Sequence, residues 1–592
     1  MKDLITFDTE TLPNYFCLCF IRLKDGKKSH IELKTADATL DDKTRTKIIA
    51  TFRNNECFGF NSNNFDIPVI QALCKGYTPQ EIADLASEII ESRKPAWMTQ
   101  KDHDFTLELP SFDVMEPAPG VRVGLKLYGA RMHFKKLQEL PIPPGHFVTK
   151  KEMKLLRGYC YNDCEVNIAV FEAIKPHIEL RRSMSKEYGM DLRSKSDAQI
   201  AEAVIKKKLT EMGVKVTKPK YKGDELFSYV PPFWIKFKSD QLKDVFSFIK
   251  KTEFGLKNNG SIDLPPDLTK IVIKIGDSTY KIGVGGLHSQ EKRQAVIAKK
   301  GEQLVDVDVA AYYPSIILNE EYFPEHLGME FLDVYGSIVD RRKEAKKTGD
   351  KVTDAALKVT INGSYGKLGS IYSVLYAPEL LLHVTLTGQL ALLMLIERLE
   401  SKGIKVTSAN TDGIICHFKD DQAKTFRKVY RKWEKQSGLV LEETSFSARY
   451  ARDVNNYLAI KHDNSYKGKG LFVSDTLTKN PTGNVIQKAA AEHIVNGVDI
   501  EDYVENANPL DFIMVRKVTG GAIYKGEEIG ALIRWVYVTG SDEVITYKKN
   551  GNKVPITDGA QPVMNIEDMP ENIDYKKYVL AIEKLLTSTG FL

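Results

Sequence analysis

The spacing of apolar positions along the chain predicts a mixture of strands and helices. Short runs rich in β-branched and aromatic residues, such as 4–10 and 57–61, are typical of strands. Longer runs with apolar residues on one helical face, such as 80–92 and 151–174, are typical of helices. Because the two kinds of run alternate over roughly the first 175 residues, we expect an α/β layer there.

Beyond residue 180 the pattern changes in blocks. A basic helical block that contains 196–213 leads to strands from about 265 to 320. Helices then fill 330–400, strands return up to about 474, including an expected hairpin at 405–418, and a mixed tail closes the chain. These changes predict boundaries near 180, 265 and 470 in a multidomain chain of α/β and α+β class.

The composition is that of an ordinary globular protein, and it does not determine the kind of partner. The 592 residues are too many for one core, and 42% of them are hydrophobic while 28% are charged. A formal net charge of +5 permits a polyanionic partner without requiring one. The N-terminus is expected to form a strand rather than a signal peptide, and no run of eighteen apolar residues is present. We therefore expect a cytoplasmic protein without a membrane span.

The cysteines predict free thiols in a reducing compartment. Their number is odd, and they show no paired CxxC pattern of the kind that binds zinc. The seven are Cys17, Cys19, Cys57, Cys74, Cys160, Cys164 and Cys416. Cys160 and Cys164 could form half of a metal site, but no second pair accompanies them, so no structural metal is expected.

Two acids stand on one side of the first predicted strand. Asp8 and Glu10 follow an apolar run, and side chains two positions apart on a strand share a face. A surface strand could carry such a pair without a role, but the apolar run favours the end of a central strand. Asp66 and Asp163 lie in similar settings, and Tyr159 shares a helical face with Asp163. Four acids in one cleft need divalent cations to neutralise them, and two such cations are the usual arrangement for phosphodiester hydrolysis.

A second pair of acids follows predicted strands further along the chain. Asp308 ends an apolar run, and Asp412 occupies the tip of the hairpin at 405–418. A turn aspartate is also common for structural reasons, since it caps its own backbone and Gly413 tolerates positive φ. If the two carboxylates meet, they can hold two Mg²⁺, one lowering the pKa of a primer 3′-hydroxyl and the other binding the incoming phosphates.

Cations recur one helical turn apart between these two acids. Lys358 and Asn362 share a helical face, and Arg342 and Lys346 repeat the spacing upstream. A basic helix is usually only solvated. Joined by a short connection, however, two such helices would form a hairpin whose cations converge on one groove, as neutralisation of a triphosphate requires. Lys358 and Asn362, stacked in this way beside Gly363 and Gly366, suit a flat or phosphate-bearing ligand better than a core.

Taken in order, these motifs resemble those of a family B DNA polymerase with a 3′→5′ proofreading exonuclease. DTE at 8–10, NSNNFD at 61–66 and YCYND at 159–163 match its three exonuclease motifs. DVAAYYPSII, KVTINGSYG and NTDG stand where the family has D-x-x-S-L-Y-P-S, K-x-x-x-N-S-x-Y-G and D-T-D-S. The resemblance implies an RNase H-like exonuclease domain followed by a polymerase domain with palm, fingers and thumb.

The resemblance also implies roles for the matched residues. The exonuclease metals would be bound by Asp8, Glu10, Asp66 and Asp163, with Tyr159 assisting the water. The polymerase metals would be bound by Asp308, Asp412 and the Val309 carbonyl. Tyr313 would lie under the deoxyribose and exclude a 2′-hydroxyl, while its neighbour Tyr312 fills the core. The triphosphate would be held by Arg342, Lys346 and Lys358, with Asn362 near the nucleotide. The implied cofactor is Mg²⁺, two per active site, for which Mn²⁺ can substitute.

Departures from the family pattern concentrate in the third polymerase motif. Asn410 and Gly413 replace an Asp and a Ser, so we expect one carboxylate there to be dispensable. Gly283 stands where a template-contacting tyrosine is usual. The family's Lys-x-Tyr motif, which grips the primer, is matched by Tyr457, but Asn455 replaces its lysine.

The lengths of the segments refine the expectation. Lys358 follows Asp308 by only 50 positions, which leaves room for a short two-helix fingers element and none for the inserted subdomains of protein-primed phage enzymes. The predicted exonuclease starts at residue 3, and this compactness favours a bacteriophage or other mobile-element enzyme. The expected domains are an exonuclease at 1–180, a helical connection and start of the palm at 181–265, palm at 266–329 and 368–470, fingers at 330–367 and a thumb at 471–592.

We therefore expect a monomeric DNA-templated DNA polymerase that uses primer–template DNA and dNTPs, works with replication accessory proteins, and replicates phage or mobile-element DNA in the host cytoplasm. Two alternatives remain. One is a protein-primed replicase of the same fold. The other is a catalytically silent nucleic-acid-binding factor, which only Asn410 and Gly413 favour.

Overall fold

The computed structural model describes residues 2–92, 94–120, 123–221, 223–283, 285–473 and 477–592. The chain divides into two compact units. Unit 1 comprises 1–196, 474–484 and 507–577, and unit 2 comprises 197–473, 485–506 and 578–592.

Unit 1 begins with a five-stranded sheet of order β3-β2-β1-β4-β5. The strands are β1 (Leu4–Leu12), β2 (Tyr15–Arg22), β3 (Lys28–Leu33), β4 (Glu56–Gly59) and β5 (Ser111–Asp113). β1 to β3 are antiparallel, whereas β4 and β5 run parallel to β1. This α/β layer confirms the alternation of strand and helix patterns in the first part of the sequence.

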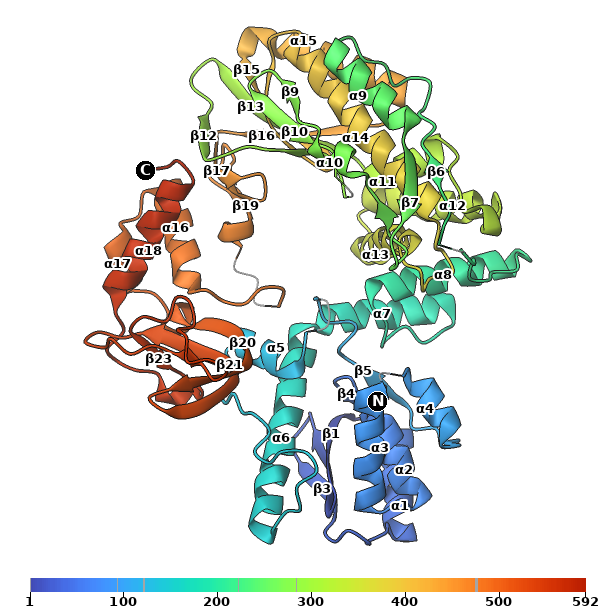
Figure 1. The fold of residues 1–592 in the computed structure, drawn as a ribbon, viewed down its shortest axis with the longest axis vertical. Coiled ribbons are helices and arrows are strands. Elements are labelled where there is room, and N and C mark those ends of the chain that lie inside the picture. Colours follow the sequence, from blue (N-terminus) through green and yellow to red (C-terminus); the bar gives the residue numbers. More distant parts are fainter. Residues whose placement is uncertain (1, 93, 121–122, 222, 284, 474–476) are drawn as a thin grey trace. The chain divides into compact units, whose positions relative to one another are not determined.

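The two faces of this sheet differ because strand side chains alternate. One face, with Phe7 and Phe20, packs against helices α1 (Asp42–Asn54), α2 (Asp66–Lys75) and α3 (Pro79–Ser92). The other face is covered by α6 (Lys150–Ala173), which lies across β1 and β2 in Figure 1. Asp8 and Glu10 belong to the α6 face, since they pair in register with Cys19 and Cys17 of β2.

A second sheet of unit 1 lies late in the sequence. Its order is β22-β20-β21-β23, formed by β20 (Met514–Tyr524), β21 (Glu527–Tyr537), β22 (Thr546–Tyr547) and β23 (Ala560–Pro562). α5 (Leu125–Arg131) packs on this sheet. The buried Arg534 donates hydrogen bonds to the carbonyls of Phe134 and Met564, at 2.5 and 2.7 Å, and so joins early and late segments of the chain.

The segment 471–592, expected to be one thumb, is therefore divided between the units. Its sheet belongs to unit 1, whereas α17 (Ile500–Glu505) and most of α16 (Asn484–Asn496) and α18 (Tyr575–Ser588) belong to unit 2. The expected boundary near 180 also lies further on, at residue 196. The reason is that α7 (Lys175–Tyr188) is followed by Ser194, whose hydroxyl accepts a hydrogen bond from the Asp113 amide at 2.9 Å.

Unit 2 is built on a seven-stranded sheet of order β16-β13-β15-β14-β11-β10-β9. Its strands are β9 (Ile273–Ile275), β10 (Ser278–Lys281), β11 (His288–Ser289), β13 (Glu302–Val309), β14 (Lys405–Asn410), β15 (Gly413–Lys419) and β16 (Leu441–Phe446). Val305 and Val307 point into a core shared with α14 (Pro378–Glu400) and α15 (Ala423–Ser437). By alternation, Asp306 and Asp308 lie on the opposite face.

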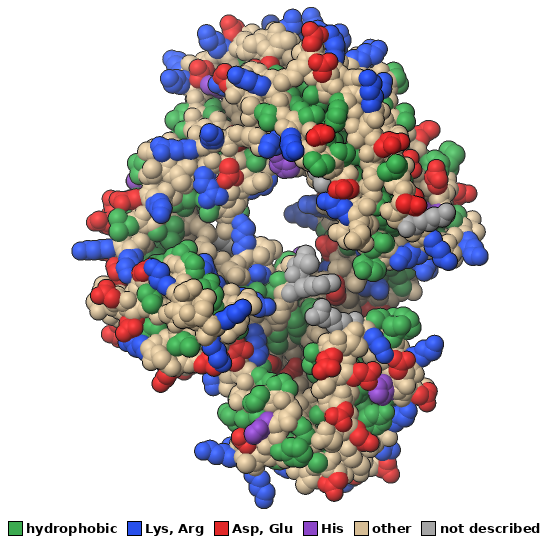
Figure 2. Space-filling model, in the orientation of Figure 1, with side chains coloured by type: hydrophobic (Ala, Val, Ile, Leu, Met, Phe, Trp, Pro, Cys, Tyr) green, Lys and Arg blue, Asp and Glu red, His purple; other side chains and the backbone are tan. Residues whose placement is uncertain are grey.

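The two core helices differ in character. α14 is the one helix, in the part of the chain that the structure describes, with the length and apolar composition of a membrane span, and 89% of its most apolar window is buried within the protein. α15 buries Phe426, Tyr430 and Trp433 and exposes lysines and arginines on its other side. Figure 2 shows these blue side chains over the part of unit 2 that holds α15.

Three helices of unit 2 form a separate layer. α12 (Glu330–Thr348) and α13 (Lys351–Leu368) form the expected helical hairpin, turning at Gly349 in the left-handed conformation. α8 (Asp197–Glu211) packs along α13. A Cβ at Gly363 would lie 2.5 Å from the Asp197 carbonyl oxygen, so this glycine permits helix contact rather than ligand approach. Gly363 is buried against α8, whereas Lys358 and Asn362 on the same helix are exposed.

Smaller elements complete the units. In unit 2 these include a four-stranded sheet of β12 (Gln294–Ile297), β17 (Ala448–Asp453), β18 (Asn456–Ile460) and β19 (Tyr466–Lys469), and a three-stranded one of β6 (Phe227–Ser228), β7 (Glu253–Leu256) and β8 (Ile262–Asp263). Its remaining α-helices are α9 (Asp240–Lys251), α10 (Pro266–Lys270) and α11 (Tyr312–Asn319), and unit 1 adds α4 (Ala96–Asp102).

Candidate active sites

The four predicted acids of unit 1 come together beside the middle of β1 rather than at its end. Asp8 and Glu10 are half-buried on β1, and Asp66 is the first residue of α2. Asp163 is buried on α6, the helix that covers their face of the sheet. Residues from three segments that are remote in sequence therefore form one acidic cluster.

The turn between β4 and α2 sets the position of Asp66. A Cβ at Gly59 would lie 2.7 Å from the Ser62 Cβ and 3.1 Å from the Phe7 carbonyl oxygen, so only glycine lets the chain turn back here. The Thr9 hydroxyl then donates a 2.6 Å hydrogen bond to Asp66. The start of a helix also favours a carboxylate, because its free amides carry partial positive charge.

The pKa values of these acids show how crowded the cluster is. Burial, followed by the charges of Asp66 and Asp163, raises the pKa of Asp8 well above its ordinary value. Burial likewise raises the pKa of Asp66 to about 7, against the opposing hydrogen bond from Thr9, and that of Asp163 to about 6. Carboxylates that resist ionisation in this way are stabilised when a cation neutralises them, so the donor set fits hard divalent metals.

Tyr159 lies beside the acids, as its spacing from Asp163 predicted. Burial, followed by the charges of Asp163 and Glu10, raises its pKa, so the hydroxyl stays protonated. Lys126 lies over the ring, with its Nζ 4.7 Å from the ring centroid. The hydroxyl is thus a hydrogen-bond donor next to the acidic cluster.

Sequence reasoning missed a fifth acid in this region. Asp113, at the end of β5, is buried and accepts hydrogen bonds from the amides of Asn61, Asn63 and Met115 at 2.9 to 3.1 Å. Its charge also contributes to raising the pKa of Asp66. With its oxygens occupied by three backbone amides, Asp113 is a structural acid that holds the turn before Asp66. Its position after a short apolar strand was the available signal in the sequence.

In unit 2, Asp308 and Asp412 meet at one pocket of about 250 Å³. Asp308 pairs with Gly413 across β13 and β15, and the Val309 amide donates a 2.8 Å hydrogen bond to the Asp412 carbonyl. Burial, followed by the charge of Asp308, raises the pKa of Asp412. The hairpin at 405–418 therefore does carry a carboxylate that lines the same pocket as Asp308.

Gly413 is required by this arrangement. A Cβ at this position would lie 1.9 Å from the Asp308 Oδ1, which no real contact allows. A serine at this position would therefore collide with the Asp308 carboxylate as it lies here. Asn410, the other departure, uses its side-chain amide to donate to the Val454 carbonyl at 3.1 Å.

Two functional candidates at this pocket were missed from the sequence. Asp306, two positions before Asp308 on the same face of β13, is a third carboxylate, and burial followed by the charge of Asp308 raises its pKa to about 6. Lys467 of β19 lies 3.5 Å from Asp306 and 3.9 Å from Asp308. The repeat V-D-V-D was the signal for Asp306, whereas nothing in the sequence places β19 at this site.

The tyrosines after Asp308 form a stack. Tyr312 is buried and its hydroxyl donates to the Gly388 carbonyl, as expected of a core tyrosine. Tyr313 lies between Tyr312 and Tyr365, with ring centroids 5.5 and 4.5 Å away, and donates a 2.9 Å hydrogen bond to the Gly285 carbonyl. The ring of Tyr313 is thus fixed from both sides.

The predicted triphosphate-binding residues lie on the helical hairpin of α12 and α13, and they differ in exposure. Lys346, Lys358 and Asn362 are exposed. Arg342 instead pairs with Asp354, at 2.9 Å, and so links α12 to α13. The structure therefore gives Arg342 a carboxylate partner, whereas the two lysines present their charges to solvent.

Tyr457 lines the same pocket as Asp308 and Asp412. It is buried, with the guanidinium carbon of Arg449 4.5 Å from its ring centroid, and it pairs in register with Lys469 of β19. Asn455, which replaces the expected lysine, contacts Asn410 instead. Lys467 and Lys469 of the adjacent strand β19 line the same pocket.

Comparisons with known proteins add little. No protein-family model matches the chain, and no curated protein matches it. A solved structure of the family B DNA polymerase from the hyperthermophilic archaeon Pyrobaculum calidifontis is 14% identical and covers 100% of this chain and 78% of that chain, with a TM-score of 0.42. A TM-score of this size does not establish a shared fold, so the residues of this chain alone support the function proposed below.

Proposed function

We propose that this protein is a template-directed DNA polymerase of the family B type, with a 3′→5′ proofreading exonuclease in unit 1. The observation that supports this most directly is the meeting of Asp308 and Asp412 at one pocket, although 104 positions separate them in the sequence. The second acidic cluster, with an adjacent tyrosine, supports the exonuclease.

For extension, each residue around the pocket has a proposed task. Asp308, Asp412 and the Val309 carbonyl would hold two Mg²⁺, which Mn²⁺ can replace. The ions supply positive charge that makes the primer 3′-hydroxyl a nucleophile and stabilises the leaving pyrophosphate. Tyr313, held rigidly in its stack, would exclude a 2′-hydroxyl by contact with the sugar.

The helical hairpin would bind the triphosphate of the incoming dNTP. Lys346 and Lys358 would neutralise its charge, with Asn362 near the nucleotide. Arg342 would position the two helices through Asp354 until a phosphate competes for it. Tyr457 would contact the primer from the adjacent sheet.

For trimming, Asp8, Glu10, Asp66 and Asp163 would hold a second pair of divalent ions. Tyr159 remains protonated, so its hydroxyl would donate to the attacking water or to the scissile phosphate and orient it. We further propose an RNase H-like fold for this part of unit 1, a compact bacteriophage-type enzyme, primer–template DNA as substrate, a monomer, and action in the host cytoplasm.

Reciprocal variants test the two assignments. Asp412→Asn should abolish primer extension and leave 3′ trimming, whereas Asp8→Ala with Glu10→Ala should abolish trimming and leave extension. Both activities are read on one gel with labelled primer–template, four dNTPs and Mg²⁺. Near wild-type extension by Asp412→Asn would contradict the polymerase assignment. A wild-type protein that binds primer–template without changing the primer would instead indicate a silent binding factor.

A further inference from the structure

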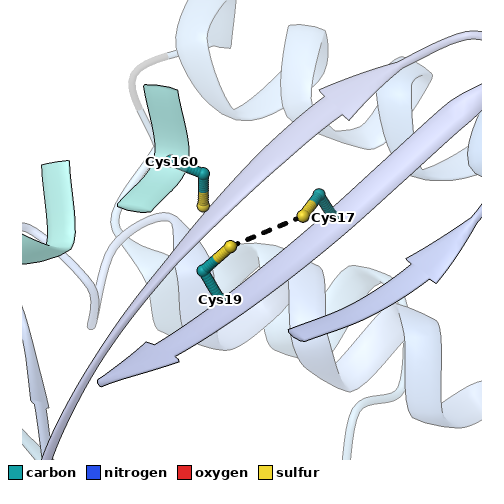
Figure 3. Close-up of side chains that lie close together, drawn as sticks. All are labelled: Cys17, Cys19 and Cys160. Atoms are coloured by element: carbon teal, nitrogen blue, oxygen red, sulfur yellow. Dashed lines mark hydrogen bonds between the residues drawn. The ribbon is translucent and has the colours of Figure 1, made fainter. Parts of the chain in front are cut away.

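Four of the seven cysteines lie on one face of the first sheet of unit 1. Cys17 and Cys19 are on β2, and Cys160 and Cys164 are one turn apart on α6, which covers that face. The sulfurs of Cys17, Cys19 and Cys160 all lie within 4.8 Å of one another. Figure 3 shows these three side chains gathered at one place, although they come from segments that are remote in the sequence.

The sulfurs of Cys17 and Cys19 lie closer together than the backbone positions of the two residues do. Side chains two positions apart on a strand start about 6.6 Å from each other. The sulfurs of Cys17 and Cys19 are nevertheless only 3.6 Å apart. Around a tetrahedral zinc ion, with Zn–S bonds of about 2.3 Å, neighbouring sulfurs are about 3.8 Å apart. The spacing of this pair therefore matches that of two ligands on one ion.

The electrostatic surroundings also favour a cation. All four thiols are fully buried, and the Cys160 sulfur lies within 4.8 Å of carboxylate oxygens of both Asp8 and Glu10. The nearby cation Lys126 lies over the Tyr159 ring. Acids and thiols thus lie together on this buried face, where the dielectric constant is low. A bound cation would therefore interact strongly with them.

We propose that Cys17, Cys19 and Cys160 bind a structural Zn²⁺ through their three sulfurs. Binding releases the thiol protons to solvent and leaves thiolates, which zinc prefers to the oxygen ligands of the neighbouring acids. The ion would fasten α6 to β2 and so fix Tyr159 and Asp163 against β1. This site adjoins the proposed exonuclease metals but uses sulfur in place of oxygen ligands, and it does not depend on the polymerase assignment.

The competing explanation is a set of packed thiols. Each sulfur does have a weak partner: Cys160 donates to the Asp8 carbonyl at 3.3 Å, and Cys164 to the Cys19 carbonyl at 3.8 Å. Cysteine is also among the residues most often buried without any role. Metal content distinguishes the two explanations, because packed thiols bind no stoichiometric zinc.

The test uses the full-length protein without a histidine tag. Zinc is measured by mass spectrometry in protein purified without added metal, and the zinc-free protein is then titrated with Co²⁺ in excess Mg²⁺, which occupies the oxygen sites. We expect one zinc per chain and, with cobalt, a sulfur-to-metal charge-transfer band in the near ultraviolet. Absence of both from wild-type protein would overturn the proposal without any variant.

Variants then assign the ligands. Cys17→Ser and Cys160→Ser should each lose the zinc. Cys74→Ser is the matched control, since this thiol is also buried in unit 1 but lies in α2, outside the cluster. Loss of zinc from Cys74→Ser, or full retention by Cys17→Ser, would contradict the assignment. Circular dichroism shows whether each variant folds.

Discussion

Gly413 offers the sharpest test of how the polymerase acids are arranged. In Gly413→Ala the new Cβ would lie 1.9 Å from the Asp308 Oδ1, whereas ordinary contacts begin at 3.4 Å. The carboxylate must therefore move by about 1.5 Å, and a misplacement of about 1 Å in a catalytic group costs about 10²-fold in rate. We expect a loss of extension rate of that size, equivalent to about 2.7 kcal/mol of transition-state stabilisation.

Gly413→Ser is expected to behave like Gly413→Ala, although serine is the residue that the family pattern has there. The backbone should accept both changes, since Gly413 lies within strand β15. Single-turnover primer extension measures the rate, with Gly158→Ala as the matched control, because that helical glycine has no neighbouring atom within 4 Å of an added Cβ. Extension by Gly413→Ala at the wild-type rate would refute the placement of Asp308 in catalysis.

Three further predictions follow from the same geometry. Gly363→Ala should lower the free energy of unfolding by about 1–3 kcal/mol, because the added Cβ meets the backbone of α8. Gly366→Ala, on the exposed side of α13, should not lower it. Denaturant titration measures both values, and equal effects of the two variants would contradict the packing of Gly363 against α8. Thr9→Val should slow 3′ trimming about tenfold, because it removes the hydrogen bond to Asp66. Thr9→Ser keeps the hydroxyl and should trim at the wild-type rate. Normal trimming by Thr9→Val would contradict the role of this hydrogen bond. Burial raises the pKa of Asp66 to about 7 and that of Asp306 to about 6, so the folded state binds more protons than the unfolded state between pH 4 and these values. Without metal, the contribution of these groups to the free energy of unfolding should therefore fall as pH rises from about 4 to 7. Mg²⁺ should raise the melting temperature more at pH 8 than at pH 5, as measured by differential scanning fluorimetry. A larger increase at pH 5 would contradict metal binding by these acids.

Much of each site could be predicted from the sequence because local patterns determine it. The period-2 alternation placed Asp8 and Glu10 on one face, and the turn signal placed Asp412 at a hairpin tip. The helical spacing of Lys358 and Asn362 likewise put both on the exposed face of α13. These features depend only on neighbours along the chain.

Features that depend on long-range packing could not be predicted. Lys467 reaches Asp308 only because β19 adds to a separate small sheet, and no local pattern states which strands will adjoin. The late sheet joins the early part of unit 1 through the buried Arg534, one of whose partners, Phe134, lies 400 positions earlier. The packing of Gly363 against α8 could not be predicted either, because the approach of that helix is visible only in three dimensions.

The most direct measurement of the central claim is a primer-extension assay on the wild-type protein with labelled primer–template and Mg²⁺. We predict longer products when the four dNTPs are present and shortened primers when they are absent. Failure to lengthen the primer with either Mg²⁺ or Mn²⁺, in a preparation shown to be folded, would contradict the proposal that Asp308 and Asp412 form a polymerase site.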